Sequence, residues 1–206
     1  MPNSPSEWDA KYRLAAEAAP SEPASIVREL LPLLPRGPAL DIACGTGRHA
    51  LFLASRSQHV TAVDCSGVAL DTLEARAHSQ HVRLKRGGSF HPPVRHLHGG
   101  VELIHANLEK VHLPESSYDL ILCLQYLQRS LFPQMVRALR PDGVLLIETF
   151  TQAQLEFSGG PRNPAYLLAT GELREAFPDL CVLFYRELRA GVGIASLVAK
   201  KRAERI

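Results

Sequence analysis

The chain has 206 residues, and 46% of them are hydrophobic, so one domain spanning residues 1–206 can bury a substantial core. Charged residues make up 21% of the sequence and balance to a formal net charge of +2. This balance excludes a global electrostatic attraction to nucleic acid or to an anionic membrane, and we expect neither as a partner. No segment approaches the roughly 20 consecutive apolar residues that span a bilayer, and the N-terminus lacks an apolar signal segment. We therefore expect a cytoplasmic protein.

The cysteines fit the same compartment. Cys44, Cys65, Cys123 and Cys181 are widely spaced, form no Cys-x-x-Cys pair, and each lies in or beside an apolar run. This pattern favours buried, reduced thiols over disulfides or zinc ligands.

The first 36 residues are expected to form a helical cap ahead of a core that covers residues 37–206. From Pro38 onward, short runs rich in Val, Ile and Leu alternate with segments of helical periodicity. This is the pattern of parallel strands joined by crossover helices. The predicted strands are Ala39–Ala43, Val60–Asp64, Val101–Ala106, Asp119–Leu124 and Val144–Glu148.

Helices are predicted between most of these strands. The first covers Gly47–Ser55, the second is capped by Ser66, and the third is capped by Ser130 with Pro133 in its first turn. Their inward residues are Ala50, Leu51, Ala54, Leu70, Leu73, Ala77, Val136 and Leu139. The Arg-Pro-Asp-Gly sequence at residues 140–143 ends the third helix and turns the chain into the next strand.

The last part of the chain has a different pattern. After a short helix near Gly171–Phe177, the runs CVLFYREL and GIASLVAK are separated only by RAGV, which is too short for a helix. They therefore predict an antiparallel hairpin. The expected fold is α/β: a Rossmann-like, doubly wound, mostly parallel seven-stranded sheet with a C-terminal antiparallel hairpin strand and helices on both faces. Residues 85–100, which contain two glycine pairs and a proline pair, are predicted to form a long loop.

A glycine loop follows the first predicted strand. Gly45 and Gly47 lie at the carboxyl end of this strand, where open parallel sheets bind their ligands. Gly45 to Ala50 also matches the G-x-G-x-x-A dinucleotide fingerprint, so the glycine spacing alone does not distinguish a nicotinamide cofactor from another ligand. Asp41 favours another ligand, because a carboxylate here would repel a pyrophosphate but attract an ammonium or sulfonium group.

The segment Asp41-Ile42-Ala43-Cys44-Gly45-Thr46-Gly47 resembles the first motif of the class I S-adenosylmethionine-dependent methyltransferases, an acidic residue followed by glycines. Ala43 stands where that family usually has its first glycine. The resemblance covers about Leu40 to Glu148. It implies that S-adenosylmethionine is the cofactor, and that a methyl group passes to an acceptor by direct displacement.

The same resemblance assigns residues to parts of the cofactor. Asp64, at the tip of the next strand, is expected to bind the ribose hydroxyls. Asn107 is expected to bind the adenine amino group, with Leu108 packed beside the ring. Cys123 and Gln125 are expected at the mouth of the site, beside the methionine part. The full predicted set is Asp41, Ala43, Gly45, Gly47, Arg48, Asp64, Cys65, Asn107, Leu108, Cys123 and Gln125.

Two further segments resemble the small bacterial methyltransferases grouped with the tellurite-resistance methyltransferases. They are WDAKYR near the N-terminus, and ETFTQAQ with GGPRNPAYLLATGEL after the fifth strand. In that group these segments cover the acceptor pocket. Together with Tyr126 at the mouth, the predicted pocket residues are Trp8, Tyr12, Tyr126, Arg162 and Tyr166. Because the sequence shows no basic face and no added recognition domain, we expect a small-molecule acceptor.

The sequence assigns no catalytic base. Displacement from a sulfonium mainly needs alignment of the nucleophile and exclusion of water, because the leaving group departs neutral. A thiolate, a selenol-like anion or a free amine needs no base at all. Tyr12, Glu148 and Tyr166 are the candidates if a base is used.

The histidines do not predict a metal site. His91, His96 and His98 are close in sequence, but they lack the i, i+4 spacing of a zinc-binding helix and lie in a segment rich in Gly and Pro. We expect a solvated loop and no metal. His49 follows the glycine loop and is expected either to touch the cofactor or to lie on a helix surface.

Two other functions are compatible with these residues. A nicotinamide-dependent oxidoreductase is supported by the G-x-G-x-x-A fingerprint with Asp64 and opposed by Asp41. A non-catalytic cofactor-binding protein with the same fold is also possible in principle, because a fold does not determine a reaction. Neither the identity of the acceptor nor the oligomeric state follows from the sequence.

Overall fold

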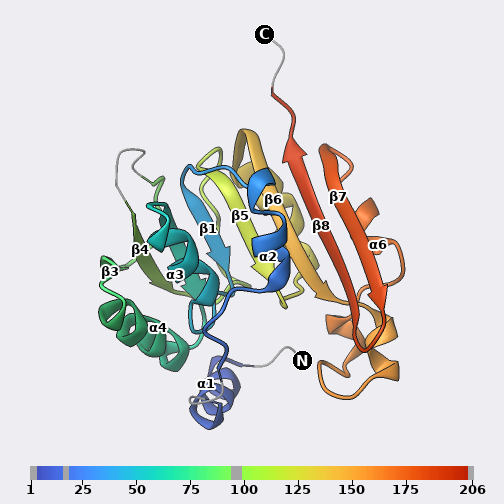
Figure 1. Cartoon of the computed structure of the whole chain (residues 1–206), viewed down its shortest axis with the longest axis horizontal. Helices are drawn as coiled ribbons and strands as arrows, with labels where there is room; N and C mark the ends of the chain where they lie inside the picture. The colour runs from blue at the N-terminus through green and yellow to red at the C-terminus, as the bar shows by residue number, and fades with distance from the viewer. Residues whose placement is uncertain (1–3, 16–18, 94–98, 204–206) are drawn as a thin grey trace.

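An eight-stranded sheet forms the centre of the computed structural model, which describes residues 4–15, 19–93 and 99–203 (Figure 1). The strand order is β3-β4-β2-β1-β5-β6-β8-β7. The strands are β1 (Ala39–Ile42), β2 (His59–Asp64), β3 (Leu84–Gly87), β4 (Gly100–His105), β5 (Tyr118–Leu124), β6 (Leu139–Phe150), β7 (Leu180–Arg189) and β8 (Gly193–Lys201). Neighbours pair in parallel from β3 to β6, and β8 pairs antiparallel with both β6 and β7.

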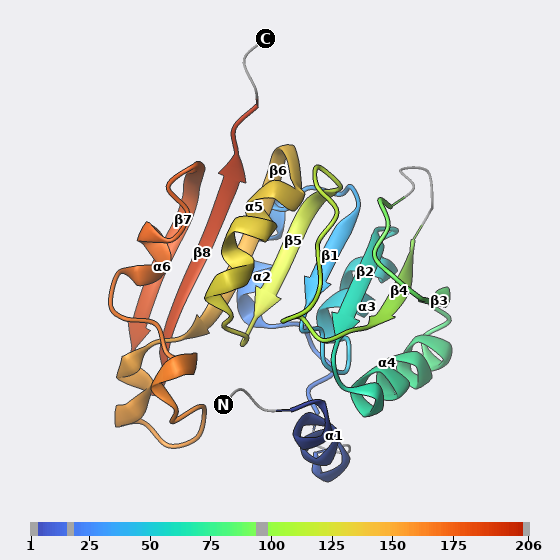
Figure 2. The same cartoon turned by 180° about the vertical axis from the view of Figure 1, so that it is seen from behind.

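Helices cover both faces of this sheet. Figure 1 shows α2 and α3 in front of it, and Figure 2, seen from behind, shows α5 and α6 on the other side. The helices are α1 (Pro5–Leu14), α2 (Ser25–Glu29), α3 (Arg48–Ser55), α4 (Gly67–Ser79), α5 (Phe132–Ala138) and α6 (Glu172–Glu175), with short 3-10 turns η1 (Leu31–Leu33), η2 (Arg129–Leu131), η3 (Gln152–Glu156) and η4 (Pro164–Tyr166). Each face therefore has its own apolar core, one under α2, α3 and α4 and the other under α5 and α6.

The predicted fold class is confirmed, and the sheet has eight strands rather than seven. The additional strand is β3, which pairs with β4 from Leu84 opposite Val101 to Gly87 opposite Ile104. It occupies the start of the stretch that was predicted to be a loop. The side chains of β3 are exposed or half-buried, so this strand lacks the apolar run that identifies the others.

The predicted C-terminal hairpin is also confirmed. Tyr185 of β7 lies opposite Leu197 of β8, and Leu197 lies opposite Ile147 of β6. β8 is therefore inserted, in reverse direction, between two strands that run parallel to each other.

The helix starts were predicted correctly for α4 and wrongly for α5. Ser66 caps α4, because its hydroxyl accepts the Ala69 N–H at 3.2 Å. Ser130 caps no helix, since it lies in η2 and α5 begins at Phe132 without a side-chain cap. The Ser130 hydroxyl instead accepts a hydrogen bond from the side-chain amide of Gln128 at 3.0 Å.

The end of α5 also differs from the prediction. Pro133 lies in its first turn as expected, but the helix ends at Ala138. Leu139 is fully buried, as predicted for an inward residue, but it is the first residue of β6. Asp142, within the Arg-Pro-Asp-Gly sequence, has a φ of +64° and provides the change of direction.

The N-terminal segment has two parts in different positions. α1 lies at the carboxyl edge of the parallel strands, beside the start of α4 (Figure 1). α2 packs on one face of the sheet, where Ile26 and Val27 are buried in the same core as α3. Only α1 is therefore placed to cover a site at the carboxyl edge. The assignment of residues 1–206 to one domain stays a prediction.

The longest helix, α4, has 13 residues. Within residues 4–15, 19–93 and 99–203, no helix has the length and apolar character needed to cross a membrane.

Replacing Gly47 by alanine is expected to destabilise the fold. Gly47 has a φ of +79°, and a Cβ atom at this position would lie 2.1 Å from Cγ of Leu73. Backbone strain and overpacking together predict that the free energy of unfolding falls by about 2–5 kcal/mol, measured by urea unfolding. Gly171 is the matched control, because it has the same φ of +79° and no atom within 4 Å of the added Cβ. An equal loss in Gly47→Ala and Gly171→Ala would show that the Leu73 contact contributes nothing.

Candidate functional site

The candidate site lies at the edge of the sheet where the parallel strands end. β1, β2, β4, β5 and β6 all run toward this edge, and the glycine loop connects β1 to α3 there (Figure 1). α1 flanks the edge on one side, and the segment with η3 and η4 flanks it on the other (Figures 1 and 2). This is the edge at which open α/β sheets bind their ligands.

A carboxylate joins the glycine loop to the end of β2. Oδ2 of Asp64 accepts the Gly45 N–H at 2.8 Å, and Oδ1 accepts the Ser66 N–H at 2.9 Å. Asp64 is only 5% exposed, and burial raises its pKa although these N–H donors act in the opposite direction. A carboxylate has about four acceptor positions, so these two bonds leave capacity for two hydroxyl groups of a ligand.

Asp41 does not face the mouth of the site. β1 ends at Ile42, so Asp41 lies within the strand, 1% exposed, and its Oδ2 accepts the Ala50 N–H of α3 at 3.1 Å. Burial raises the pKa of this carboxyl to about 7. The expectation of an open anion that repels a pyrophosphate is therefore wrong, and its physical reason is that the side chain points beneath α3. The role of Asp41 as a cofactor ligand stays a prediction.

Ala43 and Arg48 flank the glycine loop, the first in a left-handed backbone conformation and the second beside carboxyl groups. Ala43, which replaces the usual first glycine of the resembled motif, has a φ of +53° and so adopts the left-handed conformation that favours glycine. Arg48 is half-buried at the start of α3 and lies in the electrostatic field of Asp41, Glu148 and Tyr12. Burial lowers the pKa of Arg48, but a guanidinium keeps its charge, so the loop carries a cation beside two carboxyl groups.

The residues predicted to contact adenine follow β4. Asn107 is half-buried, and its Oδ1 accepts the Glu109 N–H at 2.9 Å, which is the hydrogen bond of an Asx turn. One further lone pair on this oxygen can accept a hydrogen bond from a ligand. Leu108 is 4% exposed, and its carbonyl accepts from the Gln128 side-chain amide at 3.2 Å. Asn107 thus has a structural role in the turn that does not exclude ligand contact.

The residues predicted at the mouth after β5 divide into exposed and buried ones. Gln125 is exposed, and its backbone N–H donates to the Glu148 carbonyl at 2.7 Å with a φ of +59°. Tyr126 is half-buried, and its hydroxyl donates to Oε1 of Gln128 at 2.5 Å. Cys123 is 1% exposed and packs inside the apolar core, so its predicted place at the mouth is wrong. Strand alternation turns it into the core under α5 and α6, whereas its neighbours Leu122 and Leu124 enter the core on the other face of the sheet.

The cysteines are only partly as predicted. All four are free thiols, and Cys44 and Cys123 are buried. Cys65, beside Asp64, is half-buried, and burial raises its pKa to about 11. Cys181 is exposed on β7, because this edge strand is not covered like the inner strands. The prediction of four buried thiols is therefore wrong for Cys181.

Glu148 lies near the end of β6, and its polar partners belong to β7 and β8. Its Oε2 accepts the Ser196 hydroxyl at 2.6 Å, and Nη2 of Arg186 lies 3.9 Å from the same oxygen. Burial raises the pKa of Glu148, whereas Arg186 and Arg48 lower it. The sequence did not identify Arg186 or Ser196, because their proximity depends on the antiparallel pairing of β6, β8 and β7.

α1 brings two of the predicted pocket residues to the glycine loop. The Tyr12 hydroxyl lies 2.7 Å from the position that a Cβ atom on Gly45 would take. Asp64, Cys65 and Arg48 are among its electrostatic neighbours, and burial raises the pKa of Tyr12. The Trp8 and Tyr12 rings are tilted at a centroid distance of 6.1 Å. Tyr12 therefore lies over the part of the site predicted to hold the cofactor.

Two further predicted pocket residues, Arg162 and Tyr166, lie apart from α1, in the segment after β6 (Figures 1 and 2). Arg162 is exposed, and its Nη1 donates to the Leu155 carbonyl at 2.8 Å. Tyr166 is half-buried in η4. Arg129 fixes this segment by donating to the Ala165 and Leu167 carbonyls at 3.1 and 3.0 Å. The structure thus brings Trp8 and Tyr12 together, and leaves Arg162 and Tyr166 on the other flank.

The sequence missed two polar residues that fix the N-terminal segment. Oδ1 of Asp9 accepts the Ser66 hydroxyl at 2.6 Å and the Val68 N–H at 3.2 Å, at the start of α4. Arg76 donates to the carbonyls of residues 19 and 20 at 2.8 and 3.1 Å and to Oγ1 of Thr46 at 2.9 Å. Each partner lies at least 30 positions away in the chain, and no local pattern predicts such contacts.

The histidines near the site have structural roles. His49 is 5% exposed, and its Nε2 accepts the Ala24 N–H at 3.3 Å, so it lies neither on the helix surface nor at the ligand position predicted for it. Burial lowers its pKa to about 3, which keeps the ring neutral. His91 lies 2.8 Å from Oε1 of the buried Glu102, so it is not simply part of a solvated loop. His96 and His98 lie outside the described residues.

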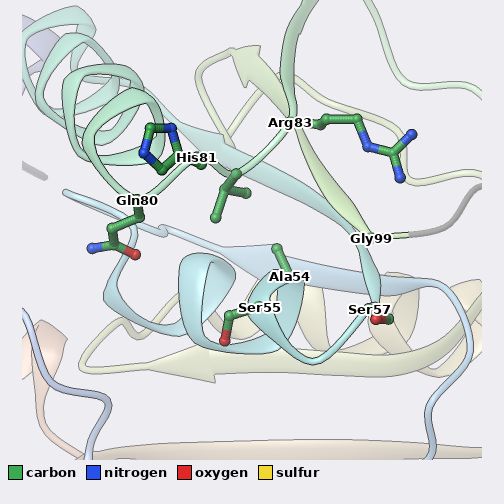
Figure 3. A pocket seen from close by; sticks show the side chains of 8 residues that line it. Ala54, Ser55, Ser57, Gln80, His81, Arg83 and Gly99 are labelled. Carbon is green, nitrogen blue, oxygen red and sulfur yellow. The ribbon is translucent and has the colours of Figure 1, made fainter.

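Among residues 4–15, 19–93 and 99–203, no group of three or more His, Cys, Asp or Glu side chains is arranged to hold a metal ion. A cavity of about 360 Å³ lies at the opposite edge of the sheet, lined by the ends of α3 and α4 together with Arg83 and Gly99 (Figure 3). It has no residue in common with the glycine loop or with Asp64, and we assign it no part in the site.

The sheet has the Rossmann-like fold of S-adenosylmethionine-dependent methyltransferases, and the glycine loop and the Asp64 carboxylate lie at its carboxyl edge. The chain belongs to the methyltransferase domain family, which it matches over residues 40–147, just over half of its 206 residues. It is 29% identical over 121 residues to the mitochondrial ubiquinone biosynthesis O-methyltransferase of Schizosaccharomyces pombe. This match covers 56% of the chain but only 39% of the yeast protein.

Solved structures of low identity share the fold. A methyltransferase from Methanosarcina mazei has a TM-score of 0.63 at 20% identity, covering 89% of this chain and all of its own. TehB from Haemophilus influenzae has a TM-score of 0.70 at 16% identity, covering 95% of this chain and 67% of its own. The 4+2 cyclase SpnF has a TM-score of 0.69 at 16% identity, covering 97% of both chains.

Asp41 is expected to make the stability of the protein depend on pH. Its folded-state pKa is raised from 3.8 to about 7, so only well below pH 3.8 is the group neutral in both states and without a penalty. As the pH rises from about 4 to 7, the unfolded chain ionises first and stability is lost. Asp41→Asn keeps an oxygen for the Ala50 N–H, and we expect it to flatten this loss and raise the Tm at pH 8 by roughly 4–8 °C, about 2 kcal/mol.

Urea unfolding of wild type and Asp41→Asn between pH 4 and pH 8 provides the test. Asp179→Asn is the control, because Asp179 is exposed and the same loss of charge there should leave the profile unchanged. Parallel profiles for wild type and Asp41→Asn would contradict the raised pKa of Asp41.

Proposed function

We propose that this protein transfers a methyl group from S-adenosylmethionine to a small-molecule acceptor. The observation that carries the proposal is the bond between the Gly45 N–H and Oδ2 of Asp64, 2.8 Å long, which joins the glycine loop of β1 to the carboxylate at the end of β2. A nucleoside needs both features at one place, a close backbone approach and an acceptor for its ribose hydroxyls. Family membership supports the same reading.

The residues present fit this methyl donor. Asp64 has two acceptor positions for the ribose hydroxyls, and Leu108 and Asn107 follow β4 where the adenine would lie. Arg48 provides a cation for the carboxylate of the methionine part. When bound, S-adenosylmethionine supplies an electrophilic methyl group on sulfur. Further residues in the proposed cofactor site are Asp41, Ala43, Gly45, Gly47, Cys65 and Gln125.

The chain's own contribution is to align the acceptor and to exclude water. A phenol is protonated near neutral pH, and burial raises the pKa of Tyr12 still further from neutrality, so we propose that Tyr12 donates a hydrogen bond rather than acting as a base. Glu148 is the better candidate for a base, since burial raises its pKa and Ser196 fixes one of its two oxygens. An acceptor that arrives as an anion or a free amine needs neither group.

We propose an acceptor pocket between the two flanks of the carboxyl edge. Trp8, Tyr12 and Tyr126 would line it from the side of α1, and Arg162 and Tyr166 from the side of η4. A net charge of +2 indicates no broad basic surface that would attract a nucleic acid, and this supports a small-molecule acceptor.

The strand order opposes the nicotinamide alternative. A dinucleotide-binding sheet of the usual type has six parallel strands in the order 3-2-1-4-5-6. Here the reversed strand β8 lies between β6 and β7. The fold alone does not assign methyl transfer, because SpnF, a 4+2 cyclase, has the same fold. Only detection of a methylated product, with release of S-adenosylhomocysteine, separates turnover from binding.

We further propose that the protein works in the cytoplasm as one domain. The four cysteines are free thiols, which suits a reducing compartment.

The donor can be identified by thermal shift. At 100 times its Kd, S-adenosylhomocysteine should stabilise the fold by about 2.7 kcal/mol, which is roughly 5–10 °C in Tm for a chain of this size. NADH at the same concentration should leave the Tm unchanged. The reverse result would favour the oxidoreductase.

Asp64→Asn is expected to weaken S-adenosylhomocysteine binding about tenfold, since one charged hydrogen-bond acceptor is lost at the ribose. Isothermal calorimetry of both proteins measures this change in Kd. Asp71→Asn is the control, because the Asp71 side chain is 70% exposed on α4 and pairs with Arg86. An unchanged Kd in Asp64→Asn would remove Asp64 from the site.

A further inference from the structure

α1 is held against the rest of the molecule by few contacts. It has no buried residue, and Leu14 at its end is 90% exposed. Trp8 and Tyr12 are only half-buried, so apolar burial contributes less to its position than to that of the helices packed on the sheet. The polar contacts of α1 therefore matter for keeping it in place.

Asp9 makes the polar contact that joins α1 to α4. Its Oδ1 accepts the Ser66 hydroxyl at 2.6 Å and the Val68 N–H at 3.2 Å. Val68 lies in the first turn of a 13-residue helix, where backbone N–H groups lack partners within the helix and favour a negative charge. These hydrogen bonds lower the pKa of Asp9, so it is ionised at neutral pH and attracted to the helix start.

The same contact leads directly to the proposed donor site. Ser66 uses its hydroxyl to bond Asp9 and its backbone N–H to bond Oδ1 of Asp64. Asp9 and the carboxylate proposed for the ribose are therefore attached to one residue from two sides. A shift of α1 at Asp9 would therefore act on Ser66, which is bonded directly to Asp64.

Tyr12 follows Asp9 by three positions, so both side chains lie on one face of α1. The Tyr12 hydroxyl lies over Gly45, 2.7 Å from where a Cβ atom would be. Arg76 fixes the chain after α1 separately, through the carbonyls of residues 19 and 20. The Asp9 contact and the Arg76 contacts are therefore separate attachments of the N-terminal segment.

We propose that Asp9 is a positioning residue, which anchors α1 to the start of α4 and thereby holds Tyr12 over the glycine loop, where it slows release of the methyl donor. This role rests on the proposed function. It assigns to Asp9 an effect that operates through Tyr12 rather than through contact with the donor.

The dissociation rate of S-adenosylhomocysteine from the full chain, measured by surface plasmon resonance, tests the proposal. Asp9→Ala should raise this rate about tenfold, and Asp9→Asn, which keeps an acceptor oxygen, should raise it less. Tyr12→Ala should raise it by a similar factor. The double variant Asp9→Ala with Tyr12→Ala should be no faster than the faster single variant, because both changes remove the same closure. Asp179→Ala, which removes an exposed carboxylate before β7, is the control and should match wild type.

Amide hydrogen exchange without ligand provides a second, independent measurement. Residues 5–14 should exchange faster in Asp9→Ala than in wild type, whereas Ile26 and Val27 of α2 should keep their protection. Multiplying effects of Asp9→Ala and Tyr12→Ala would overturn the proposal, as would an unchanged dissociation rate in Asp9→Ala and Asp9→Asn. Failure of the wild-type chain to bind S-adenosylhomocysteine would instead refute the proposed function, and is recognised before any variant is compared.

Discussion

The hydrogen bonds of the Asp64 carboxylate connect the elements at the carboxyl edge of the sheet, and the architecture of this edge depends on them. It accepts N–H groups from Gly45 and Ser66, so it ties the loop after β1 to the start of α4 while ending β2 itself. A carboxylate that is 5% exposed would be costly without such donors, and two backbone N–H groups meet that need. Because these donors belong to the backbone, the arrangement depends on the path of the chain rather than on the identity of neighbouring side chains. The glycine loop and the acidic strand end are therefore one structural unit.

The fixed charges near the glycine loop do not include Asp41, which the sequence indicated as the anion that favours a cationic ligand. Asp41 is fully buried beneath α3 and has a pKa near 7, so it is not a fixed negative charge at the mouth. Asp64 remains close to the site, and Arg48 adds a positive charge between Asp41 and Glu148. The strand order, in which β8 runs antiparallel to both of its neighbours, is instead the observation that favours a methyl donor over a dinucleotide.

The sequence predicted well what local patterns encode. β1, β2 and α3 each have an apolar run or an apolar face, and the short connection before Gly193 allows only a hairpin. β3 was missed because its side chains are not buried, and the exposure of Cys181 was missed because β7 is an edge strand. In the site, the positions of the glycine loop and Asp64 were predictable because the loop directly follows β1 and Asp64 is the last residue of β2. The bond between Asp9 and Ser66 spans 57 positions, and Tyr12 likewise lies over a residue, Gly45, that is distant in the sequence. Such contacts depend on the folded path of the chain.

A reaction by direct displacement depends less on any single side chain than on the enclosure that aligns the reacting atoms and excludes water. The two parts of this enclosure differ in how they are held. The sheet with α2 to α6 is held by two apolar cores, so the floor of the site is rigid. α1 has no fully buried residue, and hydrogen bonds from the start of α4 to Asp9 join it to the rest of the molecule. Under the proposed function the site admits a charged donor and releases its product, and detachment of α1 would leave both apolar cores intact, because neither core contains a residue of α1.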